Sequence, residues 1–424
     1  MVLSRYNFFV DVGDGVVVYN SFSGAIIRLE RQTYDLLIKE DYETLSADYY
    51  DTLRENGIIV EFDELEYIRK TREKIAEKDE KFALTILTTT KCNARCFYCY
   101  EHGVEKKDMD QDVAVALINY IKENIGQRKL HITWFGGEPL VNKKVIDYIS
   151  STLTSLKIDF SASMVTNGLL VTSVNSDDIK KWHLTKAQIT LDGIGEEYNR
   201  IKNYSCYYAS AFEVVISNIE WMLSNNIFVT IRINFDPKEI SNAINTIEYI
   251  YSKFGNNKYL RVYAANINDD KVILPNEQSE EENAYLHIYK KLIDCDYVNG
   301  LPDLQLKAKM IYCGNVHKSF LVVNPDGSFY KCEHAVNREE EVVGNVFSSD
   351  IDISKVHKWA ETEYPYSECY ICNCLPVCQG GCKALLLYNG RRSNCLQIKS
   401  VIPKIIEYYY DWWKKKTIGT KSEC

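Results

Sequence analysis

The chain has 424 residues, of which 46% are hydrophobic and 12% aromatic, and its formal net charge is −9. This length and composition predict an ordered globular protein of two or three domains, and the negative charge argues against a non-specific nucleic-acid binder. No apolar run reaches the ~20 residues that span a membrane, and the apolar stretch near the N-terminus is short and broken by Asp11, unlike a signal peptide, so we expect a cytoplasmic protein with no membrane or nucleic-acid partner.

Residues 1–80 are predicted to form a separate N-terminal domain. Strands are expected at 6–12, 15–21, 24–30 and 58–62, and helices at 31–39, 45–56 and 63–81. Three strands followed by helices resemble the small winged-helix-like domain that binds leader peptides in peptide-modifying systems, and the resemblance implies that role here. A generic N-terminal cap on the following domain is the alternative.

Residues 82–266 alternate between strand and helix patterns. Six strands are expected, at 82–90, 129–135, 160–166, 186–191, 228–235 and 258–265. Six strand–helix units predict an α/β fold with a parallel sheet, closed or partly closed as a barrel. In such barrels chemistry gathers at the C-terminal ends of the strands. The unusual segments of this chain follow those ends, which favours an enzyme: a cysteine triplet, a Gly-Gly-Glu-Pro segment, Thr-Asn-Gly and Asp-Gly.

The cysteine triplet, Cys92, Cys96 and Cys99, lies within eight residues of KCNARCFYCYE. Three thiolates this close repel one another at a cost of roughly 3 kcal/mol per pair, for a separation of ~6 Å and an effective dielectric constant of ~20, and a bound metal removes that cost. Thiols stay reduced in the cytoplasm, so the 14 cysteines of the chain favour metal ligation over disulfides. Three ligands leave one iron of a four-iron cluster open to a substrate. A structural zinc knuckle is the alternative.

The spacing of the triplet, with the aromatic Tyr98 before its last cysteine, resembles the cluster motif of radical S-adenosylmethionine (SAM) enzymes. The resemblance implies a partial (βα)6 TIM-like barrel and a 4Fe-4S cluster whose open iron is chelated by SAM. It also implies reductive cleavage of SAM to a 5′-deoxyadenosyl radical, with Tyr98 against the adenine.

The segment Gly136-Gly137-Glu138-Pro139 matches the part of the family that binds the amino group of SAM. Glycines let the backbone approach a ligand closely, and the Glu138 carboxylate can accept a charge-assisted hydrogen bond from an ammonium group. A simple turn after a strand is the alternative.

Three further residues are expected to contact SAM. Thr190 and Asp192 alternate along the fourth strand, so their side chains face the same way, and the family's similar segment binds the ribose hydroxyls. Asp192 as a plain turn former is the alternative. Arg232 is expected to pair with the SAM carboxylate, with Arg200 as its competitor.

A second set of seven cysteines lies beyond residue 300. In the same region a hairpin is expected over 319–332. An amphipathic helix is expected over 402–416, and we expect it to pack on the protein itself. The set comprises Cys313, Cys332, Cys369, Cys372, Cys378, Cys382 and Cys395. Its spacing resembles the SPASM domain, the auxiliary-cluster module of radical SAM enzymes that modify peptides and proteins. Zinc ribbons, which share only the paired cysteines, are the alternative.

The SPASM resemblance implies two auxiliary 4Fe-4S clusters, and therefore three clusters in all. Cys369, Cys372, Cys378 and Cys395 would ligate an outer cluster, and Cys313, Cys332 and Cys382 an inner one. The inner cluster lacks a fourth cysteine, because residues 314–331 contain none. Its fourth position is either open to a substrate thiolate or filled by one of the remaining cysteines, with Cys374 favoured over Cys206, Cys295 and Cys424.

Glu333 directly follows Cys332, where the sulfatase-maturing branch of the family carries an acidic general base, and we expect Glu333 to serve as the catalytic base. A plain surface carboxylate is the alternative for this residue.

Together these features predict a leader-binding domain (1–80), a radical SAM partial barrel (81–300) and a SPASM domain (301–424). The expected activity is modification of a ribosomally made precursor peptide, with an open inner cluster favouring a thioether crosslink and a flavodoxin or ferredoxin as reductant. Carbon–carbon crosslinking, formylglycine formation in sulfatases and a non-catalytic iron–sulfur or zinc protein remain as alternatives.

Overall fold

The computed structural model describes residues 1–78, 80–205, 211–267, 278–298, 308–389 and 395–419. The chain divides into two compact units, each assembled from segments far apart in the sequence. Unit 1 comprises Met1–Ile75, Asn268–Cys313 and Thr362–Cys424, and unit 2 comprises Ala76–Ile267 and Gly314–Glu361. Each unit is described by itself, and the domain boundaries expected near residues 80 and 300 stay predictions.

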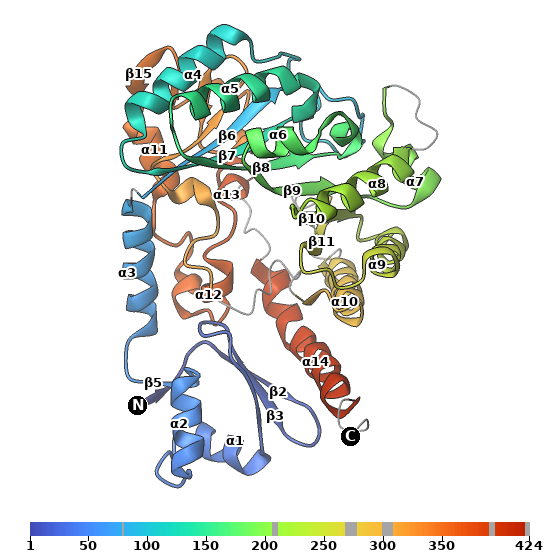
Figure 1. The fold of residues 1–424 in the computed structure, drawn as a ribbon. Coiled ribbons are helices and arrows are strands. Elements are labelled where there is room, and N and C mark those ends of the chain that lie inside the picture. Colours follow the sequence, from blue (N-terminus) through green and yellow to red (C-terminus); the bar gives the residue numbers. More distant parts are fainter. Residues whose placement is uncertain (79, 206–210, 268–277, 299–307, 390–394, 420–424) are drawn as a thin grey trace. The chain divides into compact units, whose positions relative to one another are not determined.

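Unit 2 is built on six parallel strands that pair with one another in sequence order (Figure 1). They are β6 Lys81–Thr89, β7 Lys129–Gly136, β8 Phe160–Thr166, β9 Leu184–Thr190, β10 Phe228–Phe235 and β11 Leu260–Asn266. The intervening helices are α4 Gln111–Asn124, α5 Lys143–Ser155, α6 Ser176–Lys181, α7 Gly195–Lys202, α8 Ala211–Ser224 and α9 Ser241–Phe254. The predicted order of alternating strands and helices is confirmed.

The strands of unit 2 have two different faces. Burial alternates residue by residue along β8, β10 and β11, as the period of a strand requires. Most of the buried positions are apolar, for example Ile231 and Ile233, whereas the half-buried positions between them include Arg232 and Asn234. One face of the sheet therefore packs as core, and the other offers polar side chains for chemistry.

The same sheet continues past β6 into the C-terminal part of the chain. Strand β12 Phe320–Val323 pairs parallel with β6, and β13 Ser328–Tyr330, β14 Gly344–Asn345 and β15 Ser348–Ile351 follow as antiparallel neighbours, before helix α11 Ile353–Ala360. The expected hairpin is confirmed. Among the described strands the order runs linearly from β11 to β15, so the barrel is partial.

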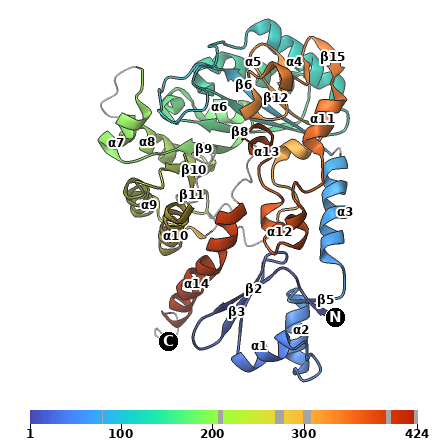
Figure 2. The same cartoon turned by 180° about the vertical axis from the view of Figure 1, so that it is seen from behind.

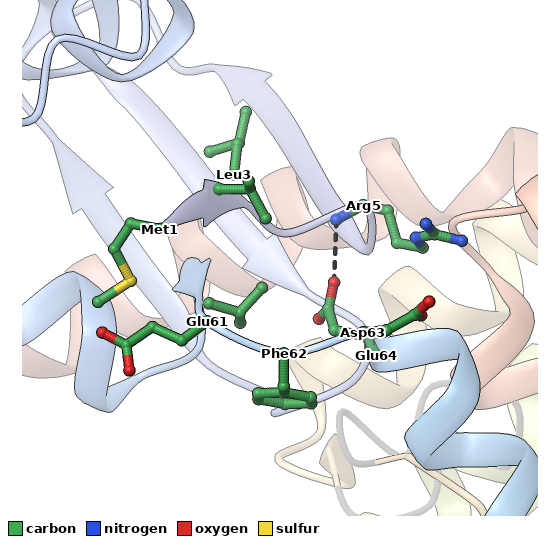
Figure 3. A pocket seen from close by; sticks show the side chains of 9 residues that line it. Met1, Leu3, Arg5, Glu61, Phe62, Asp63 and Glu64 are labelled. Carbon is green, nitrogen blue, oxygen red and sulfur yellow. Dashed lines mark hydrogen bonds between the residues drawn. The ribbon is translucent and has the colours of Figure 1, made fainter.

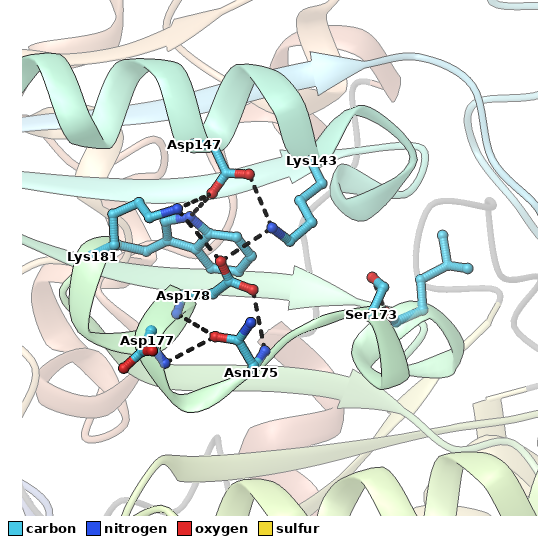
Figure 4. Close-up of polar contacts among 9 residues, drawn as sticks. Lys143, Asp147, Ser173, Asn175, Asp177, Asp178 and Lys181 are labelled. Carbon is cyan, nitrogen blue, oxygen red and sulfur yellow. Dashed lines mark hydrogen bonds and ion pairs between the residues drawn. The ribbon is translucent and has the colours of Figure 1, made fainter.

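Buried charges between α5 and α6 are structural. The Asp178 carboxylate is 3.1 Å from Lys143 and 3.5 Å from Lys181, and Asp147 accepts a hydrogen bond from the Trp182 indole at 2.8 Å (Figure 4). Asn175 caps the start of α6. Each of these charges has a partner, and the network joins α5 to α6.

Unit 1 joins the N-terminal segment to the C-terminal one. Its antiparallel sheet contains β2 Asn7–Asp11, β3 Val16–Asn20 and β4 Ile26–Leu29, and a ribbon pairs β1 Val2–Leu3 with β5 Ile59–Val60. The helices are α1 Arg31–Ile38, α2 Ala47–Glu55, α3 Glu64–Glu77, α10 Gln278–Asp294, α12 Leu375–Cys378, α13 Lys383–Asn389 and α14 Cys395–Gly419. Apart from β1, which the sequence does not predict, the strands and helices of the N-terminal segment match the predicted ones in type and order.

Helix α14 contains the amphipathic segment expected at 402–416, and it packs against α10 and touches β2 and β3 (Figure 2). The expectation that this tail packs on the protein is confirmed. Within the described residues, no helix combines the length and apolar character needed to cross a bilayer.

Candidate functional site

The cysteine triplet lies in the loop that follows β6, and neighbouring segments of unit 2 hold this loop by its backbone. Arg95 donates its N–H to the Lys202 carbonyl at 2.8 Å, and Ser205 donates to the Asn93 carbonyl at 2.7 Å. The three thiols are half-buried. Burial raises the pKa of Cys92 to about 12, and the charges of Glu138 and of the other two cysteines add to the effect. A site that disfavours isolated thiolates in this way suits a bound cation, which would remove the repulsion.

The Gly-Gly-Glu-Pro segment packs directly on the base of the cysteine loop. Gly137 and Glu138 donate their N–H groups to the carbonyls of Thr89 and Lys91, at 3.0 and 2.9 Å. A Cβ on Gly136 would lie 2.1 Å from the Thr89 oxygen, and one on Gly137 would lie 2.5 Å from the Lys91 oxygen. The close approach that these glycines permit is therefore to the chain leading into Cys92.

Gly137→Ala is expected to destabilise this junction, by roughly 1–3 kcal/mol or more, because the added methyl meets backbone oxygen that cannot move freely. Differential scanning calorimetry of the cluster-free protein measures the effect. Gly314→Ala is the matched control, because its Cβ would sit 3.6 Å from the Phe320 ring, an ordinary contact. Equal melting temperatures for the two variants would contradict the packing argument.

Glu138 is fully buried, and its carboxylate ties the ends of β7 and β8 together. It accepts hydrogen bonds from the Thr166 hydroxyl at 2.8 Å, the Asn167 N–H at 2.8 Å and the Leu140 N–H at 3.2 Å. Burial raises its pKa to about 7, and these donors only partly oppose the effect. The protein's own donors occupy both oxygens, so the contact expected between this carboxylate and the SAM amino group stays a prediction.

The raised pKa of Glu138 makes a prediction about pH. A carboxyl with a folded pKa above its unfolded value favours folding while protonated, so the wild type should lose stability relative to Glu138→Gln as the pH rises from about 5 to about 8. Melting temperatures of both cluster-free proteins across this range measure the difference. A constant difference would show that the carboxyl does not titrate in this window.

A buried ion pair lies beside the cysteine loop and is the main feature that the sequence reasoning missed. Asp192 and Lys202 are 1% and 2% exposed, and the Lys202 ammonium is 2.7 Å from the carboxylate. The Tyr98 hydroxyl also donates to Asp192, and the Asn234 N–H donates to its other oxygen at 2.8 Å. Burial acts to lower the pKa of Lys202, but the negative charges of Asp192 and Cys96 outweigh it and raise the pKa overall.

A sequence signal for Lys202 did exist. Lys202 is four residues after Tyr198 on α7, so the two side chains share one face of the helix, and the ammonium lies 5.8 Å from the Tyr198 ring. A lysine on the buried face of an amphipathic helix near a predicted site is unusual. By contrast Arg200, the competitor considered for the SAM carboxylate, is exposed and pairs with Glu197 at 2.6 Å.

Thr190 and Arg232 lie side by side in the sheet. They are paired in register across β9 and β10, and the Arg232 Nε donates to the Asn234 side chain at 2.8 Å. The structure therefore brings Thr190, Arg232 and Asp192 to one edge of the sheet, near Tyr98. Their roles in binding SAM stay predictions.

The Cys332 segment lies against the cysteine loop within unit 2. The imidazole of His334 stacks on the Tyr100 ring with centroids 4.4 Å apart. The Tyr100 phenol has a pKa well above its usual value, because the protein limits its hydration and because Glu101, Glu333, Cys99 and Cys332 place negative charge nearby. Glu333, the expected base, is half-buried at the start of a short 3-10 turn, Glu333–Ala335.

The other C-terminal cysteines lie in unit 1. Cys372 has its pKa lowered to about 6, because the thiol of Cys374 donates a hydrogen bond to it. Cys374 is buried, and its N–H lies 3.4 Å from the Cys372 sulfur, so it belongs with the loop of Cys369, Cys372 and Cys378. Cys374 therefore groups with the expected outer ligands.

The remaining cysteines are placed as follows. Cys313 and Cys382 belong to unit 1 and Cys332 to unit 2, so the inner set is divided between the units. Cys295 is buried; Cys206 and Cys424 lie outside the described residues, as does the side chain of Cys395 at the start of α14. Across the described ranges, no three Cys, His, Asp or Glu side chains are gathered tightly enough to hold a metal ion as they stand, so the ligand sets stay predictions. The chemistry of both thiol-rich loops nevertheless suits iron–sulfur clusters.

Comparison with known proteins agrees with this geometry. Residues 86–250 match the Radical SAM superfamily. The chain is 26% identical over 310 residues to the radical SAM cyclopropyl synthase TigE of Paramaledivibacter caminithermalis, covering 60% of this chain and 65% of TigE. It is 30% identical over 178 residues to a GTP 3′,8-cyclase of Clostridium perfringens, covering 38% of this chain and 50% of the cyclase. The chain thus spans less than two thirds of either relative.

Solved structures share the fold at low sequence identity. Native anSMEcpe with bound AdoMet and Cp18Cys peptide aligns with a TM-score of 0.54 and 17% identity, covering 78% of this chain and 94% of the other. Streptococcus suis SuiB bound to precursor peptide SuiA aligns with a TM-score of 0.53 and 14% identity, covering 92% and 98%. We conclude that this chain carries a radical SAM domain over residues 86–250, within an α/β fold that it shares with anSMEcpe and SuiB.

Proposed function

We propose that this chain is a radical SAM enzyme that modifies a ribosomally made precursor peptide. The observation that carries the proposal is the meeting of the cysteine loop, the Gly-Gly-Glu-Pro segment and the buried Asp192–Lys202 pair at one edge of the parallel sheet. The peptides bound to anSMEcpe and SuiB, as their descriptions state, support a peptide as the substrate class.

Each part of the site would have its own role in this reaction. When bound, a 4Fe-4S cluster and SAM supply a 5′-deoxyadenosyl radical able to abstract hydrogen from an unactivated carbon. The three thiols of the triplet would hold that cluster, and the backbone of residues 136–139 would fix the loop. Asp192 and Lys202 form a preorganised pair of opposite charges, and their proposed role is to orient the ribose hydroxyls and the carboxylate of SAM. A flavodoxin or ferredoxin would supply the electron.

We propose thioether formation as the bond-forming outcome, with two auxiliary clusters available as electron acceptors. Its support is the absence of a cysteine from residues 314–331, together with the grouping of Cys374 with the outer ligands. These features argue against a fourth thiolate from residues 314–331 or from Cys374, and a substrate thiolate would complete the inner set. Carbon–carbon bond formation is the second candidate, favoured by the similarity to a cyclopropyl synthase.

Glu333 remains the proposed base for the proton lost from the substrate. The support for this role is that Glu333 lies near Tyr100 and the cysteine loop. Its negative charge is one of the causes that raise the pKa of Tyr100. Glu333→Gln is expected to slow product formation while leaving 5′-deoxyadenosine formation in place. Unchanged product formation by this variant would rule the role out.

The N-terminal segment is the proposed leader-binding part. Beside the β1–β5 ribbon it has a pocket of about 390 Å³ whose apolar lining includes Leu3, Val60 and Phe62 (Figure 3). Glu61, Asp63 and Glu64 outnumber the single cation Arg5 in the lining. This chemistry suits a leader segment that pairs an apolar side chain with a basic one.

The test is an anaerobic reaction of the reconstituted, reduced enzyme with SAM and a cysteine-bearing precursor peptide, with and without its leader. The proposal expects 5′-deoxyadenosine and a product lacking two hydrogen atoms, formed faster with the leader. Loss of iodoacetamide labelling at the peptide cysteine identifies a thioether, whereas retained labelling identifies a carbon–carbon bond. A gain of carbonyl character at a cysteine or serine would instead identify formylglycine formation.

A further inference from the structure

Four side chains of the N-terminal segment carry buried hydrogen-bond donors for which the described residues offer no acceptor. They are the hydroxyls of Tyr6, Tyr19 and Tyr42 and the Nε–H of Arg72. Tyr6 and Tyr19 are 1% and 0% exposed, and Arg72 is 6% exposed. Burying such a donor without a partner is unfavourable, so an acceptor is expected in the working protein.

Two of these side chains, Tyr19 and Arg72, reach the cysteine-rich loop of unit 1. Tyr6 packs in one apolar cluster with Tyr364 and Leu375, and Cys369 lies against that cluster. Burial raises the pKa of the Tyr19 phenol, and Cys374 adds to this effect because it lies close to the phenol. Tyr19 therefore lies beside the segment that carries the expected outer-cluster ligands.

Arg72 reaches the same loop from helix α3. Its Nη1 donates to the Gln379 carbonyl at 3.0 Å, one residue after Cys378, and its guanidinium lies 4.7 Å from the Tyr364 ring centroid. The Ser21 hydroxyl donates to the Asn373 carbonyl at 2.5 Å, and Arg69 pairs with Glu363 at 3.1 Å. Hydrogen bonds and an ion pair thus join the N-terminal segment to residues 363–379.

An ordered water is a weaker explanation for these donors than sulfur. A buried water requires two to four polar partners, and Tyr19 is fully buried with its ring stacked on that of Phe8. Thiolate and sulfide sulfurs of an iron–sulfur cluster accept hydrogen bonds, and donors to them, like nearby positive charge, raise the reduction potential.

We propose that the N-terminal segment is part of the outer cluster site, and that Tyr19 and Arg72 donate hydrogen bonds to the sulfur atoms of a cluster held by the loop of Cys369, Cys372 and Cys378. The inference rests on the proposed auxiliary cluster. These residues stabilise the reduced cluster, so the segment that captures the leader also sets the potential of the electron acceptor. Removing residues 1–80 would therefore disturb the outer site and would not isolate leader binding.

The test uses full-length protein carrying Cys96→Ala, which removes the SAM-binding cluster and leaves the auxiliary signals. Tyr19→Phe is compared with Tyr42→Phe, because Tyr42 also has a buried hydroxyl without an acceptor but packs in the other core of the segment, away from the cysteines. Redox titration followed by electron paramagnetic resonance gives the midpoint potentials. Tyr19→Phe should shift one auxiliary midpoint to a more negative value and speed iron loss to a chelator, and Tyr42→Phe should change neither.

Arg72→Lys provides a second, independent comparison, since lysine keeps the charge and lacks the Nε donor. It should shift the same midpoint as Tyr19→Phe and in the same direction. In the cluster-free protein, Tyr19→Phe should melt no lower than the wild type, because the hydroxyl has no partner to lose. Unchanged midpoints in Tyr19→Phe and Arg72→Lys at full iron content would overturn the proposal.

Iron content separates this inference from the proposed function. Without Cys96→Ala, three clusters correspond to about twelve irons per chain. A chain that loads only about four irons yet forms 5′-deoxyadenosine would overturn the outer-site proposal and keep the radical SAM activity. A chain that loads fully and forms none would overturn the activity and leave the donors testable by their potentials.

Discussion

Replacing Lys202 with methionine is expected to destabilise the protein by roughly 3–5 kcal/mol, because the Asp192 carboxylate would stay buried without its counter-charge. The Tyr98 hydroxyl and the Asn234 N–H would remain as partners of Asp192 but carry no charge. We also expect SAM binding to be lost, since the variant lacks the one buried cation seen beside the described cysteine loop. Chemical denaturation measures the first effect, and equilibrium dialysis with labelled SAM on the cluster-loaded protein measures the second.

Two further variants separate stability from binding. Lys202→Met combined with Asp192→Asn removes both charges, so most of the stability should return while SAM binding does not. Lys180→Met is the matched control, because this lysine forms only a long, exposed pair with Asp177 at 3.8 Å and should change neither property. If the double variant bound SAM normally, the pair would be structural and its proposed part in holding SAM would be wrong.

Cys96→Ala is expected to abolish 5′-deoxyadenosine formation and to lower the iron content by about four per chain, because a cluster held by three thiolates does not survive the loss of one. Iron and acid-labile sulfide analysis, followed by mass spectrometry after anaerobic reduction with dithionite in the presence of SAM, measures both. The backbone of the loop should remain anchored, since Arg95 and Ser205 hold it through main-chain groups.

Cys374→Ala is the matched comparison, as a cysteine that lies in the other thiol-rich loop and beside Cys372. It should keep 5′-deoxyadenosine formation and change only the auxiliary clusters. If the wild type loaded iron fully but formed no 5′-deoxyadenosine, the non-catalytic iron–sulfur alternative would replace the enzyme proposal.

The helices and strands could be predicted from the sequence because each depends on a pattern of neighbouring residues. Buried and half-buried positions alternate along β8 and β10, and the turn at Pro325–Gly327 is predicted from three adjacent residues. The cysteine triplet likewise depends on spacing within one loop, and the order of strands with helices between them predicts a parallel sheet. For these reasons the radical SAM domain could be inferred before any coordinates.

Other features depend on segments that meet only after folding. The sequence gives no register by which β12 should join β6, and it does not show that residues 362–424 pack with the N-terminal segment. Packing also sets the glycines of residues 136–137 against Thr89 and Lys91, which the spacing of the motif does not show, and their contact with SAM stays a prediction.

The buried pair of Asp192 and Lys202 also separates what the sequence predicts from what only the folded structure shows. By itself the sequence determined which residues could carry charge, bind metal or turn the chain, because these properties belong to single side chains and short spacings. Only the tertiary structure decided which of them lie together away from water, because burial and pairing are set by contacts between distant segments, and the energy of a charge depends on those contacts.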